Sequence, residues 1–230
     1  MGSNDLGLWA GSQRLKTLAR HFRQRKQPVA AAEVAFTKRA AVLVCLFRGE
    51  DGNLRVILTK RASTLSSYSG EVSLPGGKME EGDADYVDTA LREAKEEIGL
   101  DPSQVNVVTV LEPFIAKSDV LVVPVIGILS DRKAFNPTPN TAEVEALFDA
   151  PLEMFLKDEN RRAEEKEWKG EEFICNFFDF ESGNKNYVIW ALTAVILITA
   201  ASLVYQRPPE FLERRPKIWT KDAVKHASMP

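Results

Sequence analysis

Three carboxylates lie within five consecutive residues in the first half of the chain. Glu93, Glu96 and Glu97 are spaced at i, i+3 and i+4, so on an α-helix they project from one face of a single turn. Like charges at this spacing destabilise a helix by roughly a few tenths of a kcal/mol per pair. Clustered hard oxygen ligands suit Mg²⁺ or Mn²⁺. The spacing therefore indicates a divalent-cation site, although an isolated cluster of this kind is more often a solvated acidic face.

A glycine-bearing turn precedes the carboxylates. Pro75 is followed by Gly76, Gly77 and Lys78, and glycine lets the backbone bring a carbonyl or an N–H close to a ligand. Residues 83–98 are rich in Ala, Leu, Arg and Glu, which favour a helix, and Gly99 is placed as its C-cap. The sequence therefore predicts a helix that presents its carboxylates beside the turn.

Together the turn and the helix resemble the Nudix box, G-x5-E-x7-R-E-U-x-E-E-x-G-U, where U is aliphatic. The second half of the pattern is matched by Arg92, Glu93, Glu96, Glu97, Gly99 and Leu100, with the small Ala94 at the first aliphatic position. The first half departs, because Gly77 and Arg92 are one residue further apart than in the pattern and Asp83 replaces the first Glu. The extra residue leaves open whether Asp83 or Asp85 pairs with Arg92.

The resemblance implies roles for the residues of the box. It assigns the Gly77 carbonyl, Glu93, Glu96 and Glu97 to Mg²⁺ or Mn²⁺, Glu96 and Glu97 to catalysis, and Gly76, Asp83, Arg92 and Gly99 to the structure of the loop and helix. The general base stays open. Glu96 is in place to activate water, and members of the superfamily also recruit bases from loops, where Glu112, Asp119 and Glu143 are the candidates.

A segment upstream of the box resembles one branch of the Nudix enzymes. Residues 57–62 (ILTKRA) and 70–77 (GEVSLPGG) are similar to the segment L-L-T-x-R-S-x3-R-x3-G-x-V-x-F-P-G-G of coenzyme A-cleaving Nudix enzymes, with the spacing kept. Ser66 replaces the second Arg and Leu74 the Phe, as in plant-type members. This branch implies hydrolysis of coenzyme A or acyl-CoA to adenosine 3′,5′-bisphosphate and (acyl-)4′-phosphopantetheine. Arg61 and Lys78 are then the expected phosphate contacts. ADP-ribose, NADH and oxidised nucleotides are the alternative substrates.

The remaining elements are read from apolar patterns. Residues 40–47 and 54–59 predict a β-hairpin, and further strands are expected at 105–111, 120–129, 143–148 and 173–180. Pro124 suggests an edge or a bulge in its strand. Residues 151–156 predict a short apolar helix, and the charged residues 157–172 a solvated excursion. Strands mixed with two separated helices predict an α/β fold, which the resemblance makes a Nudix-type α/β/α sandwich around a mixed β-sheet.

An uncharged run from residue 186 to residue 206 is long enough to span a membrane. Thr199, Ser202 and Gln206, however, share one helical face, which suits a helix that covers a sheet. The run also looks like the closing helix of the Nudix branch. A core helix is therefore expected, and a membrane as partner is unlikely.

We divide the chain into a basic N-terminal helix and linker (1–36), a Nudix hydrolase domain (37–209) and a C-terminal tail (210–230). A formal net charge of −3 does not indicate a nucleic acid as partner. A small-molecule substrate is therefore expected, and a homodimer is left open. His21 and His226 lie in the tails, which argues against Ser-His-Asp or Cys-His chemistry. No secretory signal is evident and two cysteines lie in apolar runs. The cytoplasm is therefore expected, with the mitochondrion as alternative because the start is basic.

Overall fold

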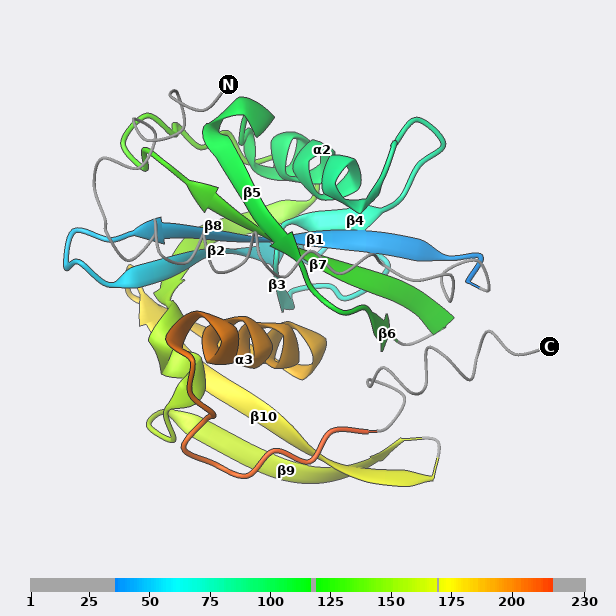
Figure 1. Cartoon of the computed structure of the whole chain (residues 1–230), viewed down its shortest axis with the longest axis vertical. Coiled ribbons are helices and arrows are strands. Elements are labelled where there is room, and N and C mark those ends of the chain that lie inside the picture. The colour runs from blue at the N-terminus through cyan, green and yellow to red at the C-terminus, as the bar shows by residue number, and fades with distance from the viewer. Residues whose placement is uncertain (1–35, 117–118, 169, 217–230) are drawn as a thin grey trace.

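A mixed β-sheet forms the centre of the molecule. The computed structural model describes residues 36–116, 119–168 and 170–216. The sheet contains β1 (Arg39–Arg48), β2 (Leu54–Arg61), β3 (Val72–Ser73), β4 (Gly76–Lys78), β5 (Val105–Val110), β6 (Phe114–Ala116), β7 (Val120–Leu129) and β8 (Val144–Pro151). Its main order is β3-β2-β1-β7-β5, with β1 and β7 parallel. Figure 1 shows one helix on each face of this sheet, so the expected α/β/α arrangement is confirmed.

Strands β1 and β2 form a hairpin and then diverge. The two strands pair only where residues 46–48 face residues 54–56. Beyond that point β2 pairs with β3 on this edge, while β8 pairs with β2 from Arg55 to Arg61. Strand β4 pairs with β1 where β2 has diverged, with Gly77 opposite Ala41. Residues 72–78 therefore fill the gap between the two diverging strands. This places the two glycines at the point where the sheet divides.

Helix α2 (Tyr86–Ile98) covers one face of the sheet. It begins after Asp85, whose side chain accepts hydrogen bonds from the backbone N–H groups of Val87 and Asp88, the usual arrangement of an N-cap. Its apolar stripe packs on β1 and β7, with Ala90, Ala94 and Ile98 fully buried. The helix starts three residues later than the expected Asp83 because Asp85 caps it.

Helix α3 (Ala191–Tyr205) covers the opposite face and is itself covered by a second, antiparallel sheet. This sheet contains β9 (Arg161–Trp168), β10 (Glu171–Ser182) and β11 (Lys185–Trp190), and Figure 1 shows α3 between the two sheets. A helix buried on both sides is apolar all round, which explains the uncharged run. The expected core helix is therefore present, but residues 186–190 belong to β11. Within the described residues, no helix has the length and apolarity needed to cross a membrane.

Two local expectations are wrong. Residues 157–172 are not a solvated excursion, because β9 pairs with β10 along its whole length, from Arg161 opposite Phe178 to Trp168 opposite Glu171. β9 is charged because it is an edge strand with exposed side chains. Pro124 lies in the central strand β7, not at an edge. Its backbone faces the interruption between β5 and β6, where its carbonyl accepts from the Leu111 N–H, so its missing N–H costs no ladder bond.

The chain after α3 continues to pack on the second sheet as far as residue 216. The Glu210 N–H donates to the Leu156 carbonyl of the short 3₁₀ helix η4 (Leu152–Leu156), and the Ile174 N–H of β10 donates to the Arg214 carbonyl. Phe211 packs against Phe178. These contacts involve residues that the sequence division placed in the tail. The expected N-terminal helix and residues 217–230 lie outside the described residues.

Candidate active site

Gly77 and Glu93 are in close contact where α2 faces β4. A Cβ atom at Gly77 would overlap with all three atoms of the Glu93 carboxyl group. Only a residue without a side chain therefore lets this carboxylate lie against the backbone. Glu93 is largely buried, with a side-chain exposure of 14%. Burial, more than any other factor, raises its pKa.

Glu97 lies one helical turn further along and is buried more deeply, at 2% exposure. Its Oε2 accepts a hydrogen bond of 3.2 Å from the Gly76 N–H, and its Oε1 lies 3.7 Å from Nη1 of Arg61. Burial raises the pKa of Glu97 to about 7, although the Gly76 N–H and the Arg61 charge act in the opposite direction. Each of the two carboxylates thus has one arginine beside it, since Nη1 of Arg92 lies 3.2 Å from Oε1 of Glu93.

Arg61 ends β2 and brings its guanidinium to Glu97. Its Nε is buried and has no hydrogen-bond partner within the part of the chain that the structure describes. Buried guanidinium donors are normally paired. An acceptor such as a phosphate oxygen would satisfy this atom, which fits the expected role of Arg61.

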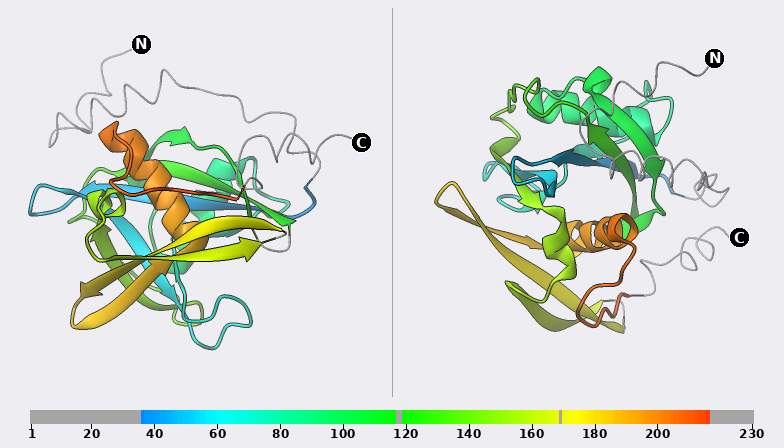
Figure 2. Two further views of the ribbon diagram at one scale, coloured as in Figure 1. Left: turned by 90° about the horizontal axis from the view of Figure 1, so that it is seen from below. Right: turned by 60° about the vertical axis from the view of Figure 1, so that its left-hand side comes forward.

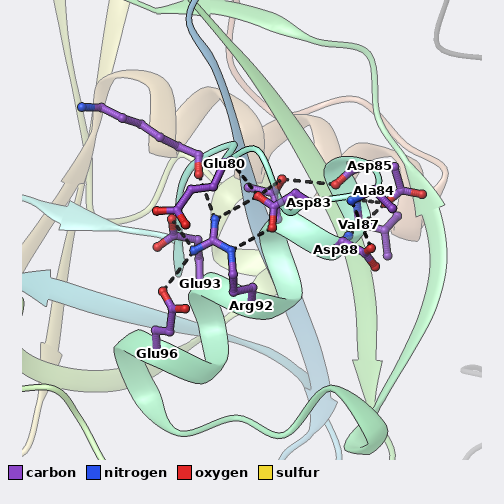
Figure 3. A network of polar contacts seen from close by, with 11 residues as sticks. Glu80, Asp83, Ala84, Asp85, Val87, Asp88, Arg92, Glu93 and Glu96 are labelled. Atoms are coloured by element: carbon purple, nitrogen blue, oxygen red, sulfur yellow. Dashed lines mark hydrogen bonds and ion pairs between the residues drawn. The ribbon is translucent and has the colours of Figure 1, made fainter.

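Asp83 is the partner of Arg92, which answers the question left by the longer box. Nε and Nη2 of Arg92 donate to the two oxygens of Asp83 at 2.8 and 3.0 Å, and Nη2 also donates to the Lys78 carbonyl at 3.0 Å. Figure 3 shows this network, with Asp85 at the start of the helix, where its carbonyl accepts from Oγ1 of Thr89. The hydrogen bonds from Arg92 hold the pKa of Asp83 well below its usual range. Asp85 serves as the N-cap.

Glu96 is the most exposed of the three carboxylates of the box, with a side-chain exposure of 57%. It accepts from Nη1 of Arg92 at 3.0 Å, and the same nitrogen lies 3.2 Å from Oε1 of Glu93, so one guanidinium contacts both carboxylates (Figure 3). Within the described residues, no group of three or more acidic, His or Cys side chains is arranged to hold a metal ion.

The donor set still has the chemistry that a divalent cation needs. Glu93 and Glu97 are acids whose pKa is raised by burial, and the nearest nitrogens of Arg92 and Arg61 lie 3.2 and 3.7 Å from their oxygens. Carboxylates that lose solvation in this way suit a hard cation with oxygen ligands, which would supply compensating charge. Among the loop candidates for the base, Glu143 carries a charge that raises the pKa of both Glu93 and Glu97.

Three further predicted residues lie in β4 and at the end of α2. Lys78 is exposed at the end of β4, and its carbonyl is held by Arg92. Gly76 approaches β1 so closely that a Cβ would overlap with the Ala41 carbonyl oxygen. Gly99 has a φ of 73° and ends α2 with hydrogen bonds to the carbonyls of Ala94 and Lys95, as the sequence predicted.

Asn140 and Glu143 complete the surroundings through contacts that sequence reasoning missed. The Asn140 N–H donates to the Glu97 carbonyl at 2.9 Å, and the Ala62 N–H, next to Arg61, donates to the Glu143 carbonyl at 2.8 Å. The Asn140 side chain donates to Oε1 of Glu143 at 3.4 Å. Residues 131–141 are rich in Pro and Asn, which is typical of a loop but does not indicate its partners.

Comparison with known proteins identifies the family. The NUDIX domain model matches residues 37–174. The chain belongs to the Nudix family. Two Arabidopsis thaliana proteins, Nudix hydrolase 15, mitochondrial, and Nudix hydrolase 22, chloroplastic, are each 67% identical to it, over 180 and 181 residues, or 78% and 79% of this chain. The aligned parts cover 63% and 60% of these relatives, so the chain spans less than two thirds of their length.

A more distant Nudix relative is the mouse peroxisomal coenzyme A diphosphatase NUDT7. It is 35% identical over 193 residues, which cover 82% of this chain and 80% of the relative. Among solved structures, the Caenorhabditis elegans Ap4A hydrolase binary complex aligns with a TM-score of 0.42 and 21% identity, over 51% of this chain and 82% of that one. A Nudix hydrolase from Alicyclobacillus acidocaldarius aligns with a TM-score of 0.43 and 20% identity, over 52% and 81%.

The turn that precedes α2 is closed by the side chain of Asp83. The Glu80 N–H donates to Oδ2 of Asp83 at 2.9 Å, and Oγ1 of Thr89 donates to the same oxygen at 2.9 Å. The spacing from Gly77 to Asp83 is that of the Nudix pattern, so the extra residue of this box lies between Asp83 and Arg92.

Proposed function

We propose that this protein hydrolyses the diphosphate bond of coenzyme A and its acyl derivatives, with Mg²⁺ or Mn²⁺ as cofactor. The products are adenosine 3′,5′-bisphosphate and (acyl-)4′-phosphopantetheine. The observation that carries the proposal is the position of Glu97, a buried carboxylate between the Gly76 N–H and Arg61 and one turn from Glu93. Acidic ligands for a cation thus lie beside a guanidinium with an unsatisfied donor, an arrangement suited to a diphosphate.

The choice of coenzyme A is supported by two further facts. The mouse relative named as a coenzyme A diphosphatase aligns over most of both chains. The segment from residue 57 to residue 77, which resembles that of coenzyme A-cleaving enzymes, forms β2, β3, β4 and their connections around Arg61 and Gly77. The segment therefore surrounds the proposed site.

Each residue of the site has a proposed task. Glu93 and Glu97, with Glu96 and the Gly77 carbonyl, would hold the cation, which neutralises diphosphate oxygens and lowers the pKa of bound water. Arg61 donates to a phosphate oxygen through Nε, and Lys78 supplies a second positive charge. Arg92 holds the turn through Asp83. A water oxygen bonds to one phosphorus as the bridging P–O bond breaks, and Glu143 or Glu96 accepts the water proton.

The compartment is also a proposal. The names of the two Arabidopsis relatives, one mitochondrial and one chloroplastic, agree with the mitochondrial alternative given by the basic first 36 residues. We therefore favour the mitochondrion over the cytoplasm. A fluorescent fusion of the whole chain, compared with one that lacks residues 1–36, tests this location.

A substrate panel tests the activity. The purified protein is incubated with Mg²⁺ or Mn²⁺ and with coenzyme A, acyl-CoA thioesters, ADP-ribose, NADH and an oxidised nucleotide, and kcat/KM is compared. We expect the coenzyme A compounds to have the highest values. A higher kcat/KM for ADP-ribose or NADH would transfer the activity to the alternative substrate class, and no cleavage of any diphosphate would refute it.

A further inference from the structure

The loop of residues 62–71 leaves the candidate site directly after Arg61 and returns to it. The Arg61 N–H donates to the Glu71 carbonyl at 2.9 Å, which closes the neck of the loop, and the Ala62 N–H donates to the Glu143 carbonyl. Figure 2 shows the loop projecting from the body of the molecule beyond the end of β2. The loop is therefore attached at its base to two residues of the site while its tip reaches into solvent.

Tyr68 lies at the tip of this loop in an unusual state. It is 52% exposed, and it is the one exposed aromatic side chain in the described part of the chain. Its φ of 54° lies in the left-handed region, which costs a residue with a side chain about 1 kcal/mol or more. The conformation is held by the Glu71 N–H, which donates to the Tyr68 carbonyl, and by Oγ of Ser69, which donates to the Ser63 carbonyl at 2.7 Å. The fold thus presents this ring to solvent at an energetic cost.

The composition of the loop indicates which part of a substrate it suits. Around Tyr68 it carries five hydroxyl side chains and, between residues 62 and 70, no charged group. These hydroxyls belong to Ser63, Thr64, Ser66, Ser67 and Ser69. Hydroxyl donors suit ribose and phosphate oxygens, and an aromatic face suits a planar base. The pantetheine arm offers amides and alkyl groups, so the nucleotide half matches the loop better.

We propose that Tyr68 stacks on the base of the nucleotide half of the substrate and so determines affinity for that half. The identity of the nucleotide as 3′-phosphoadenosine rests on the proposed function; the stacking role rests on the position and exposure of Tyr68. A ring that contacts a part of the substrate remote from the reacting phosphorus contributes to KM more than to kcat.

The test compares Tyr68→Ala with Tyr68→Phe, which keeps the aromatic face. Both variants keep a side chain at the same positive φ, so the backbone strain is matched. Binding of the two products, adenosine 3′,5′-bisphosphate and 4′-phosphopantetheine, is measured separately by calorimetry in the presence of Mg²⁺. We expect Tyr68→Ala to weaken the nucleotide product about 5- to 30-fold and to leave 4′-phosphopantetheine within about 2-fold, with Tyr68→Phe close to wild type. KM for coenzyme A should rise similarly, with little change in kcat.

The other outcomes overturn the inference. Unchanged nucleotide binding in Tyr68→Ala, or weakening confined to 4′-phosphopantetheine, would show that the ring does not contact the base. If Tyr68→Phe, which keeps the ring, weakens the nucleotide as much as Tyr68→Ala does, the aromatic face is not responsible and the stacking role is wrong. Failure of the proposed function is distinct, because then the wild-type protein would not cleave coenzyme A, whatever the binding data show.

Discussion

Arg92 donates hydrogen bonds of 2.8 and 3.0 Å to the two carboxylate oxygens of Asp83, across the turn that precedes α2. The Asp83 side chain is only 5% exposed and that of Arg92 23%. We expect Asp83→Asn to lower the free energy of unfolding by about 1–3 kcal/mol, since a partly buried, charged hydrogen-bonded pair is broken. Urea unfolding measures this change.

Asp85 supplies the control for that variant. It caps α2 from an exposed position, and Asn caps a helix about as well as Asp does. We therefore expect Asp85→Asn to change the unfolding free energy by no more than about 0.5 kcal/mol. Equal effects of the two variants would show that Arg92 does not depend on Asp83.

The contribution of Asp83 should depend on pH in one direction. Arg92 holds the pKa of Asp83 below the value of about 4 that an unfolded chain gives it. A lowered pKa in the folded state means that the stabilisation is complete above the unfolded pKa and is lost as the pH falls. The difference between wild type and Asp83→Asn should therefore be constant above about pH 5 and shrink below about pH 4. A constant difference down to pH 2.5 would contradict the ion pair.

Glu97 should be required for activity but not for folding. Glu97→Gln keeps an oxygen for the Gly76 N–H while removing the charge, so we expect kcat to fall by at least about 100-fold and the circular dichroism spectrum to be unchanged. Mn²⁺ should raise the melting temperature of the wild type more than that of this variant, because a cation that binds only the folded state stabilises it. An active Glu97→Gln enzyme would overturn the metal assignment.

Replacing each of the two glycines of the turn by alanine should affect a different property, activity in one case and stability in the other. At Gly77 the new methyl group overlaps with the end of the flexible Glu93 side chain, so we expect lost activity and weaker Mn²⁺ binding with little loss of stability. At Gly76 it overlaps with the backbone of Ala41 and Val42, so we expect a loss of about 2 kcal/mol or more in unfolding free energy. Activity assays and thermal melts on both proteins distinguish the two.

The segment after α3 should contribute to stability. Phe211 packs on Phe178, and the guanidinium carbon of Arg161 lies 4.1 Å from the ring centroid of Phe211. The neighbouring Leu212 is 75% exposed. We expect Phe211→Ala to lower the unfolding free energy by about 1–3 kcal/mol and Leu212→Ala to change it by less than about 0.5 kcal/mol. Similar values for the two would mean that the segment does not pack on the second sheet in solution.

The sequence by itself determined the local features. Glu93 and Glu97 share a helical face because the period of the helix fixes their spacing, and Gly99 ends α2 because it adopts the left-handed conformation without steric cost. Strands β1, β2, β5, β7, β8 and β10, the two helices and the α/β class follow from patterns of the same short range, as does the resemblance to the Nudix family.

Only the tertiary structure decided which side chains meet across the chain. Asp83 and Asp85 are the same residue type and lie two residues apart, and only the path of the turn shows that one binds Arg92 and the other caps the helix. The same holds for Glu143, whose carbonyl accepts from the Ala62 N–H, next to Arg61. Charged residues 161–168 form a strand because β10 offers them a free edge. Such partners depend on chain segments far apart in sequence, and no local spacing records them.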